Sequence, residues 1–426
     1  MRFLKGSRNE FEKLKDDVSW DERAESIRRQ LAEVFGAKNL SFLLGSGCSS
    51  LREGDEELGI PTMGPLAKEF HALITAIPED GATHTFVNSE RTHELYQKLG
   101  IDLCADNTRT NLEQMMAVLM NASQFCRASD KKEFYEAASF VDKIIVDIKK
   151  FILKKCTTGA YVTDNDSVVI LYQKFYQSLA TRARGLAPPW IFTTNYDLFN
   201  ERAMDRSGVS YSNGFSGTVE RRFNPATYRF ALAEQLDITS RRWAAVDGFV
   251  HFCKLHGSVN WIEESTGLYP IRESHAPLDP SKDRVMIYPT PSKQTASFGS
   301  PYSDMFREFQ RQVIQDQSVL VVMGFSFGDE HVNNIIFQGL TLPSFRLIAF
   351  IDPDTNDVTR QLSALGDPRI WFIWGEGRDA SKKAHYFDGI VNSLLPTSAD
   401  QKVDQAIEKV LQQLISKNQD IHDGAE

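Results

Sequence analysis

Four short segments of the chain carry residue types that could bind a nucleotide and act on it. They read GSGCS at 45–49, TTNYD at 193–197, LHGS at 255–258 and GFSFGD at 324–329. Each follows a β-branched or aromatic stretch that is typical of a buried strand. Because an open α/β sheet binds its ligand at the carboxyl ends of its strands, the four segments together predict a nucleotide crevice.

The two glycine-rich segments predict contacts with phosphate groups. Glycines directly after a strand let the backbone approach a diphosphate, and the N-terminus of a following helix supplies N–H donors. Gly45, Ser46 and Gly47 have this arrangement, and Gly324 with Ser326 repeats it after a later strand. No acidic residue ends a second strand about 20 residues further on, as the dehydrogenase fingerprint requires. The pattern therefore disfavours a hydride-transfer enzyme, and a purely structural turn is the alternative at 45–47.

The other two segments supply side chains for acid–base chemistry. Asn195 can hold a ribose hydroxyl, a carboxamide or a water, and Asp197 can accept from an amide or a ribose. His256, just past a strand and before a glycine, is suited to act as a general base on a hydroxyl or water. Each has a structural alternative, because Asn195 or Asp197 can cap a helix and His256 can be a hydrogen-bonded structural residue. Asp329 is expected to cap or brace the helix that follows it.

The composition narrows the function classes. The chain has 426 residues, 42% hydrophobic and 25% charged, so it can bury a large core and is expected to form more than one lobe. Its net charge of −9 disfavours direct binding of nucleic acid, which depends on clustered Lys and Arg. No apolar run approaches the roughly 20 residues of a membrane span, and no signal-peptide pattern is evident. We therefore expect a cytoplasmic protein.

Three classes of site are disfavoured by missing motifs. The five cysteines are far apart and never form a C-x-x-C pair, which fits a reducing compartment and excludes a four-cysteine zinc module. The motif G-x-x-x-x-G-K-[ST] does not occur, so the chain is not expected to hydrolyse ATP. The segment HELYQ at 93–97 lacks the second histidine of a zinc protease.

The elements that must position these segments follow from the hydrophobic pattern. Helical spacing predicts helices over 19–36, 112–120, 134–152, 168–179 and 399–416, the first with a capping box from Ser19 and Glu22. Strands are predicted over 40–44, 190–194, 249–255, 284–288, 319–323, 346–351 and 370–374. The stretch 262–303, rich in Pro, Ser and Thr, predicts a long ordered loop. For the amphipathic helix at 399–416, docking on its own domain is favoured over a partner interface.

The alternation of strands and helices predicts an α/β fold with a Rossmann-like parallel sheet and a helical insertion. An N-terminal helical extension is expected at 1–39, and the nucleotide-binding α/β domain at 40–64 and 186–395. The helical insertion is expected at 65–185, and a C-terminal amphipathic helix and tail at 396–426.

Together, the four segments resemble the sirtuin (SIR2) family. The GAG-type loop, the T-x-N-x-D segment, the H-G pair and the G-x-S motif occur in that order between about residues 40 and 355. The form VMGFSFGDEH at 322–331 is especially similar to bacterial SIR2-like NAD hydrolases of antiphage defence. Some of these proteins work with a partner such as a HerA-type hexameric ATPase, so the resemblance implies such a partner and self-association.

The resemblance implies NAD as the substrate and gives the residues their roles. Asn195 and Asp197 would hold the nicotinamide ribose and carboxamide, and His256 would be the catalytic base. The diphosphate and the adenosine side would contact the remaining candidates, which are Gly45, Ser46, Gly47, Gly324, Ser326 and, as a weaker candidate, Asp352. The hypothesis requires that Asn195 and His256 meet over the same sugar ring.

The departures from the family indicate which reaction to expect. Deacetylating sirtuins carry a zinc tetrad after the H-G pair, whereas this chain has no cysteine beyond Cys253. Their I-P-D-F-R loop reads IPTMG at 60–64 here, and their F-G-E-like segment reads MIYP at 286–289. The segments that bind NAD in sirtuins are present, and those that bind acyl-lysine are not. This difference favours water as the acceptor.

The leading expectation is therefore an NAD glycohydrolase that releases nicotinamide and ADP-ribose without a metal, as a partner-controlled effector of antiphage defence. A divergent deacylase or ADP-ribosyltransferase is one alternative. A non-catalytic sensor of NAD or ADP-ribose is the other.

Overall fold

The architecture is built on one large, mostly parallel sheet. The computed structural model describes residues 1–12, 18–54, 56–75, 89–157, 166–183, 185–237, 242–264, 270–275 and 301–397. From edge to edge the strands are β2 (Arg8–Asn9), β1 (Arg2–Lys5), β17 (Ile370–Trp374), β16 (Arg346–Phe350), β15 (Ser318–Met323), β3 (Asn39–Leu44), β6 (Trp190–Thr193), β12 (Val250–Lys254) and β7 (Tyr211–Ser212). All pairs from β17 to β7 are parallel, and β1 and β2 pair antiparallel at one edge. The predicted α/β, Rossmann-like fold is confirmed.

The strand order reverses direction at β3, and this reversal places the site. After β3 the chain builds β6, β7 and β12 on one side, and it then returns to build β15, β16 and β17 on the other side. Loops that leave two neighbouring strands in opposite directions open a crevice at their carboxyl ends. The segments that follow β3 and β15 are the two glycine-rich segments at 45–49 and 324–329.

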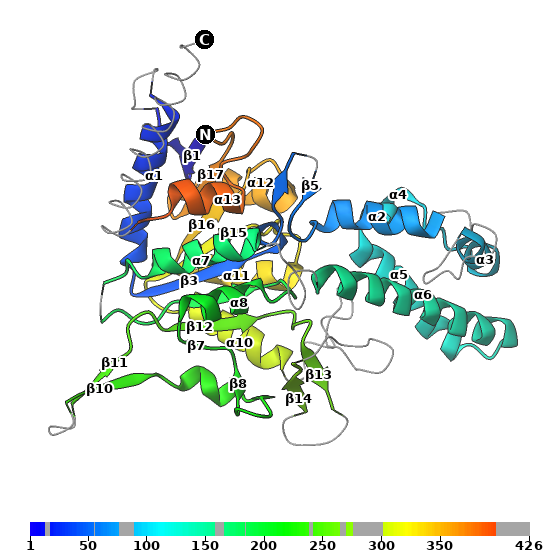
Figure 1. The fold of residues 1–426 in the computed structure, drawn as a ribbon. Helices are drawn as coiled ribbons and strands as arrows, with labels where there is room; N and C mark the ends of the chain where they lie inside the picture. The colour runs from blue at the N-terminus through cyan, green and yellow to red at the C-terminus, as the bar shows by residue number, and fades with distance from the viewer. Residues whose placement is uncertain are drawn as a thin grey trace, which may run out of the picture.

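Both faces of the sheet are covered, as the near-continuous apolar strands require. On β3, Phe42 and Leu44 pack into one buried cluster and Leu43 packs into the other. The first cluster lies under α1 (Trp20–Phe35), α7 (Ser167–Leu179) and α8 (Phe199–Ser207). The second lies under α10 (Tyr302–Val313), α11 (Glu330–Leu340) and α12 (Asp357–Ala364). The result is a three-layer sandwich (Figure 1).

The N-terminal region combines the predicted helix with two strands. Helix α1 begins at a capping box in which Ser19 and Glu22 bond reciprocally, as their spacing predicts. The residues before it were expected only as a helical extension, but β1 pairs with β17 along the edge of the sheet. The four residues of β1, RFLK, do not alternate between polar and apolar side chains and are too short a signal to identify this edge strand.

Between β3 and β6 the chain leaves the sheet and forms a group of helices. They are α2 (Met63–Thr75), α3 (Ser89–Leu99), α4 (Asp106–Arg109), α5 (Leu112–Ala128) and α6 (Lys132–Cys156), and they extend to the right of the sheet in Figure 1. Helix α7 is different because Phe175 packs edge-on against Phe42 of β3, with ring centroids 5.2 Å apart. We therefore place the end of the helical insertion before α7, although the sequence pattern alone extends it to residue 185.

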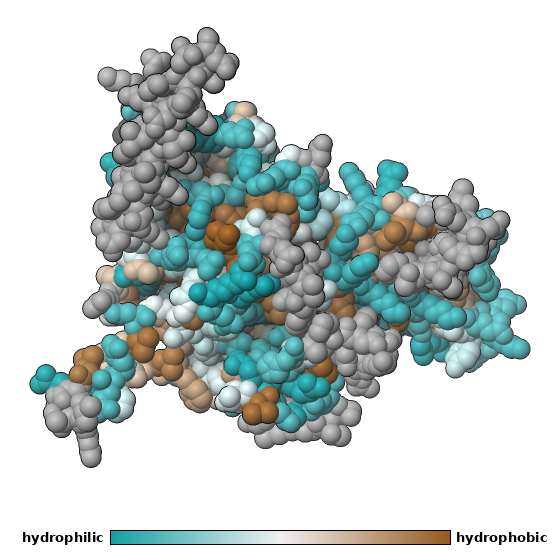
Figure 2. All heavy atoms as spheres, viewed as in Figure 1, coloured by the Kyte–Doolittle hydropathy of each residue, from teal (hydrophilic) through white to brown (hydrophobic). Residues whose placement is uncertain are grey.

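Short strands form smaller sheets beside the main one. A four-stranded sheet joins β13 (Trp261–Glu263), β14 (Ile271–Glu273), β9 (Arg222–Phe223) and β8 (Phe215–Ser216), and a short hairpin joins β4 (Arg52–Glu53) to β5 (Glu56–Glu57). A projecting hairpin joins β10 (Ala233–Asp237) to β11 (Arg242–Ala245) and exposes Leu236 and Trp243. Figure 2 shows brown, hydrophobic side chains on this projection. Strand β14 and the start of α10 fall in the stretch 262–303, so its described parts are not purely loop.

Some expectations fall outside the described residues. These are the strand at 284–288, the segment MIYP at 286–289 and the amphipathic helix at 399–416. Among the helices that the structure describes, none is long and apolar enough to cross a membrane.

Candidate active site

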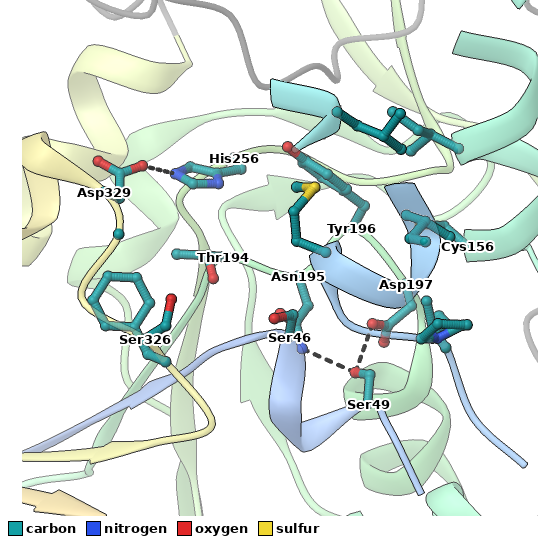
Figure 3. A pocket seen from close by; sticks show the side chains of 18 of the residues that line it. Ser46, Ser49, Cys156, Thr194, Asn195, Tyr196, Asp197, His256, Ser326 and Asp329 are labelled. Atoms are coloured by element: carbon teal, nitrogen blue, oxygen red, sulfur yellow. Dashed lines mark hydrogen bonds and ion pairs between the residues drawn. The ribbon is translucent and has the colours of Figure 1, made fainter. Parts of the chain in front are cut away.

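A cavity of about 290 Å³ opens at the carboxyl ends of the central strands. All four segments singled out in the sequence contribute to its lining, although they lie far apart along the chain. Its polar lining comes from Ser46, Ser49, Thr194, Asn195, Tyr196, Asp197, His256, Ser326 and Asp329 (Figure 3). Asn195 and His256, separated by some sixty positions, therefore lie on one cavity, as the hypothesis requires.

The predicted glycines lie behind this cavity and hold two of its loops together. The Gly45 N–H donates to Met323 O, and the Gly47 N–H donates to Gly324 O, both at 2.9 Å. A Cβ on Gly45 would lie 2.4 Å from Gly324 O, and one on Gly324 would lie 2.5 Å from the Cys48 nitrogen. Gly324 also adopts φ +61°, a conformation that favours glycine. Glycine is therefore required at positions 45 and 324 because the loop after β3 packs directly on the loop after β15.

The backbone around Gly45 differs from the predicted phosphate-binding pattern in one respect. A short 3₁₀ turn, η1 (Ser46–Cys48), follows Gly45, and the β4–β5 hairpin comes next. The first α-helix after this loop is α2, so no α-helix begins directly behind Gly45. Ser46 and Ser326 still lie on the cavity lining, one from each of the two glycine-rich loops.

Asp352, the weaker candidate, lies further along the same edge of the sheet. It follows β16, the neighbour of β15, and its Oδ1 accepts from the Asp354 N–H at 3.0 Å in a turn. It is not part of the cavity lining.

The amide of Asn195 is fixed in one orientation. Its Nδ2 donates to Gly45 O and to Ser49 Oγ, both at 2.9 Å, and the side chain is 7% exposed. Both amide hydrogens are therefore used, and Oδ1 accepts no hydrogen bond from the described residues. Toward a ligand Asn195 acts as an acceptor, which suits a water or a ribose hydroxyl.

Ser49 connects Asn195 to Asp197 and was not among the predicted site residues. Its hydroxyl accepts from Asn195 and donates to Asp197 Oδ2 at 2.7 Å, and it lies 3.1 Å from the Tyr172 hydroxyl. Burial raises the pKa of Tyr172 well above its ordinary value, so this phenol stays protonated and can donate. Asp197 Oδ1 accepts from the Phe199 N–H at 3.0 Å, but the N-cap position of α8 is Leu198, so Asp197 is not the helix cap that the structural alternative predicts. Ser49 stands in the GSGCS segment, which is the one sequence signal for it.

His256 faces an acidic partner that the sequence did not reveal. Its Nε2 lies 3.0 Å from Asp329 Oδ2 (Figure 3). The other oxygen of Asp329 accepts from the His331 and Val332 N–H groups and caps α11, which confirms the expected capping role. Asp329 therefore links the start of α11 to the imidazole.

A buried ion pair underlies the site. Lys254 Nζ lies 2.9 Å from Glu201 Oε1 and also donates to the Tyr196 and Asp197 carbonyls. Burial raises the pKa of Glu201 to about 7, and the Lys254 ammonium opposes this shift. Lys254 thereby connects the end of β12, two residues before His256, to the loop that carries Asn195.

The opposite wall of the cavity is apolar and comes from the insertion and the loop before it. Ile60, Met63, Leu66, Leu112 and Ile152 line it, together with Pro61, Asn111 and Cys156. Burial raises the pKa of the Cys156 thiol to about 12, so this cysteine is a neutral, apolar part of the wall. The IPTMG segment at 60–64, which replaces the I-P-D-F-R loop of sirtuins, thus contributes contact surface without a charge.

The comparison with known families agrees with this arrangement. Residues 189–382 match the model of the SIR2-like domain. The matched segment runs from β6 past β17, and it carries Asn195, Asp197, His256, Ser326 and Asp329. The SIR2-like match covers somewhat less than half of the chain, and β3 with the GSGCS loop lies before it. A search of curated proteins found no match.

SIR2-like domains use NAD. Asn195 presents an acceptor, His256 a titratable ring and Ser46 and Ser326 two hydroxyl groups, a set that suits a ribose and its neighbouring phosphates. Among the described residues, no group of three or more His, Cys, Asp or Glu side chains could hold a metal ion.

Proposed function

We propose that this protein is an NAD glycohydrolase, which cleaves NAD to nicotinamide and ADP-ribose. The observation that carries the proposal is the meeting of Asn195 and His256 on one cavity at the strand-order reversal, within a segment similar to SIR2-like domains. A cavity of about 290 Å³ is at the low end for small-molecule sites, roughly 300–1,000 Å³, and would hold the nicotinamide riboside end of NAD.

The side chains support a hydrolytic reaction. Nicotinamide in NAD is already cationic, so breaking its glycosidic bond gives a neutral leaving group and an oxocarbenium-like ribose. Asn195 Oδ1 would accept a hydrogen from water and orient it toward the anomeric carbon, because its amide hydrogens are held elsewhere. His256 would take a proton from that water or from a ribose hydroxyl.

The apolar side of the cavity supports water, and not an acylated peptide, as the acceptor of the ADP-ribosyl group. The wall opposite Asn195 consists of buried apolar side chains of α2, α5 and α6, including Leu66, Leu112 and Ile152. These side chains belong to the insertion, which occupies one side of the cavity. The zinc tetrad that supports the acyl-peptide groove in deacetylating sirtuins is also missing from the sequence.

The test is to incubate the purified full chain with NAD and to follow nicotinamide and ADP-ribose by chromatography. His256→Ala and Asn195→Ala should each lower the rate of nicotinamide release by about 10²–10⁴-fold, the usual contribution of an acid–base group or of correct positioning. His93→Ala, an exposed histidine on α3, is the matched control and should keep the wild-type rate. Wild-type rates in both site variants would refute the assignment.

The same assay separates the alternatives. Release of nicotinamide only when an acylated peptide is present, or transfer of label to protein, would favour a deacylase or an ADP-ribosyltransferase. Tight binding of NAD without turnover under any condition would favour a sensor.

By the resemblance stated above, we also propose an NAD-depleting role in antiphage defence, self-association and control by a HerA-type ATPase partner. Light scattering would measure self-association, and the rate of NAD loss with and without the co-expressed ATPase would test control. A monomer whose rate is unaffected by the ATPase would contradict both proposals.

A further inference from the structure

We propose that Asn333 of α11 is a positioning residue for the loop at 324–329, which it holds so that the Gly328 N–H donates to the diphosphate of a bound dinucleotide. The kinetic consequence of this role rests on the proposed function. Its effect on ligand binding does not, and it can be measured without turnover.

The loop contains one residue in an unfavourable backbone conformation. Phe327 has φ +57°, which residues other than glycine rarely adopt because their Cβ comes close to the following carbonyl oxygen. Its ring is 2% exposed and packs on Phe325 with ring centroids 5.4 Å apart. Since the buried ring excludes glycine at this position, other contacts must hold the strained backbone.

Asn333 supplies such a contact from outside the cavity. Its Nδ2 donates to Phe327 O at 2.8 Å, and the residue is 5% exposed and is not part of the cavity lining. Its Oδ1 is buried without a hydrogen-bond partner among the described residues, which opposes stability. An apolar side chain of the same size would avoid this cost, so the bond to Phe327 O is what the amide contributes.

This bond fixes the direction of the next N–H group. Phe327 O and the Gly328 N–H belong to one planar peptide group, and in the usual trans form they point in opposite directions. With Phe327 O held toward Asn333, the Gly328 N–H is directed away from that side chain, and Gly328 lines the cavity. No acceptor among the described residues takes this N–H, so it is available to a ligand oxygen.

The surroundings of Gly328 favour an anionic oxygen as that acceptor. Ser326 O accepts from Asn356 Nδ2, so two consecutive peptide groups of the loop are held by side chains. The Ser326 side chain lies on the cavity lining (Figure 3). No Lys or Arg belongs to the described lining, so N–H and hydroxyl groups are the donors that the cavity offers to a phosphate. Backbone N–H groups presented by a turn are a common site for this ligand.

The test measures the Kd of ADP-ribose for the purified full chain by isothermal titration calorimetry. Asn333→Ala removes the donor to Phe327 O, so the peptide group is no longer held and the Gly328 N–H loses its fixed direction. We expect the Kd to rise by about 10–100-fold, as for the loss of a hydrogen bond to a charged group, with the same number of sites as in the wild type. A partly unfolded variant would instead show fewer sites with the wild-type Kd.

Two further variants control this comparison. Asn333→Leu keeps the size of the side chain and removes the same donor, so it should raise the Kd equally even where alanine destabilises the fold. Asn334→Ala is the matched control, because it makes the same substitution at the next position of α11, where the side chain is exposed. It should change the Kd by less than about twofold.

The kinetic readout separates the inference from the proposed function. In an active protein, the KM for NAD should rise by the same factor in the Asn333 variants while kcat changes by less than about threefold, as for a contact made equally in the ground and transition states. If the wild type binds ADP-ribose but releases no nicotinamide, the proposed function fails while the comparison of Kd values still decides the inference. A wild-type Kd in Asn333→Leu, or no binding of ADP-ribose by the wild type, refutes it.

Discussion

At the scale of single residues, the Ser49 hydroxyl is the link on which the orientation of Asn195 depends. It accepts from Asn195 and donates to Asp197, and all three side chains are less than one-tenth exposed. Ser49→Ala leaves one amide hydrogen of Asn195 without its acceptor. We expect the free energy of unfolding to fall by about 1–3 kcal/mol and nicotinamide release to fall by about 10–100-fold. Urea denaturation and the product assay measure the two effects.

Ser50→Ala is the matched control, because the Ser50 hydroxyl donates to Glu57 on the neighbouring hairpin and is not part of the cavity lining. It should change the rate by less than about twofold. An equal effect of the two serine variants would contradict a specific role for Ser49.

The sequence identified Asn195 and His256 because each lies directly after a strand in a short segment of recognisable form. It did not identify the partners that orient them. Ser49 and Asp329 are about 150 and 70 positions away from the residues that they contact, and only the sheet order brings them together. Asp329 could be predicted as a helix cap, which is a local property, but not as the neighbour of an imidazole.

At the scale of elements, the site depends on how closely the loops after β3 and β15 approach. Gly324→Ala should test this contact, because a Cβ there would lie 2.5 Å from the Cys48 nitrogen in addition to the strain of φ +61°. We expect the free energy of unfolding to fall by more than about 3 kcal/mol, from positive φ and steric overlap together. Denaturant titration of the purified variant measures it.

Gly366→Ala measures the cost of the positive φ alone. Gly366 has the same φ of +61°, but the atom nearest to a new Cβ there is Ser7 Cβ at 3.8 Å, which is an ordinary contact distance. It should cost about 1–2 kcal/mol. Equal costs at the two glycines would show that the approach of the two loops is not a constraint.

Long, strongly periodic elements could be predicted, and short or edge elements could not. The strands β3, β6, β12, β15, β16 and β17 and the helices α1, α5, α6 and α7 all lie where the hydrophobic pattern indicates. Strand β1 is four residues long and depends on its pairing with β17, which the local sequence does not record. The helical spacing of α7 is the same as that of α5 and α6, so the hydrophobic pattern alone does not separate it from them. Its packing on β3 distinguishes it.

At the scale of the whole molecule, the cavity is a joint product of the sheet and the insertion. The sheet supplies the polar side through the loops after β3, β6, β12 and β15, and helices α2, α5 and α6 supply apolar side chains. The sheet domain therefore carries the side chains proposed for the chemistry, and the helical insertion forms the apolar side of the space for a ligand.

The stability of the whole chain should depend on pH through a histidine outside the cavity. His251 of β12 stacks on Trp190 with ring centroids 4.4 Å apart, and its Nδ1 is buried without a partner among the described residues. Burial, with a smaller contribution from Arg311, lowers the pKa of His251 to about 4. Between pH 6.5 and 4 the unfolded chain therefore binds more protons than the folded chain. The stability from this site is complete above pH 6.5 and is lost as the pH falls through 4.

His251→Phe keeps an aromatic ring against Trp190 and removes the titration. The stability of the wild type relative to this variant should fall by up to about 3 kcal/mol between pH 7 and pH 4, the equivalent of a shift from 6.5 to about 4. Urea denaturation of both proteins across this range gives the difference. The comparison with the variant is needed because other groups also make the stability depend on pH: burial lowers the pKa of His385 and raises that of Glu201 to about 7. Parallel curves for the two proteins would show that His251 is protonated equally in the folded and unfolded chains.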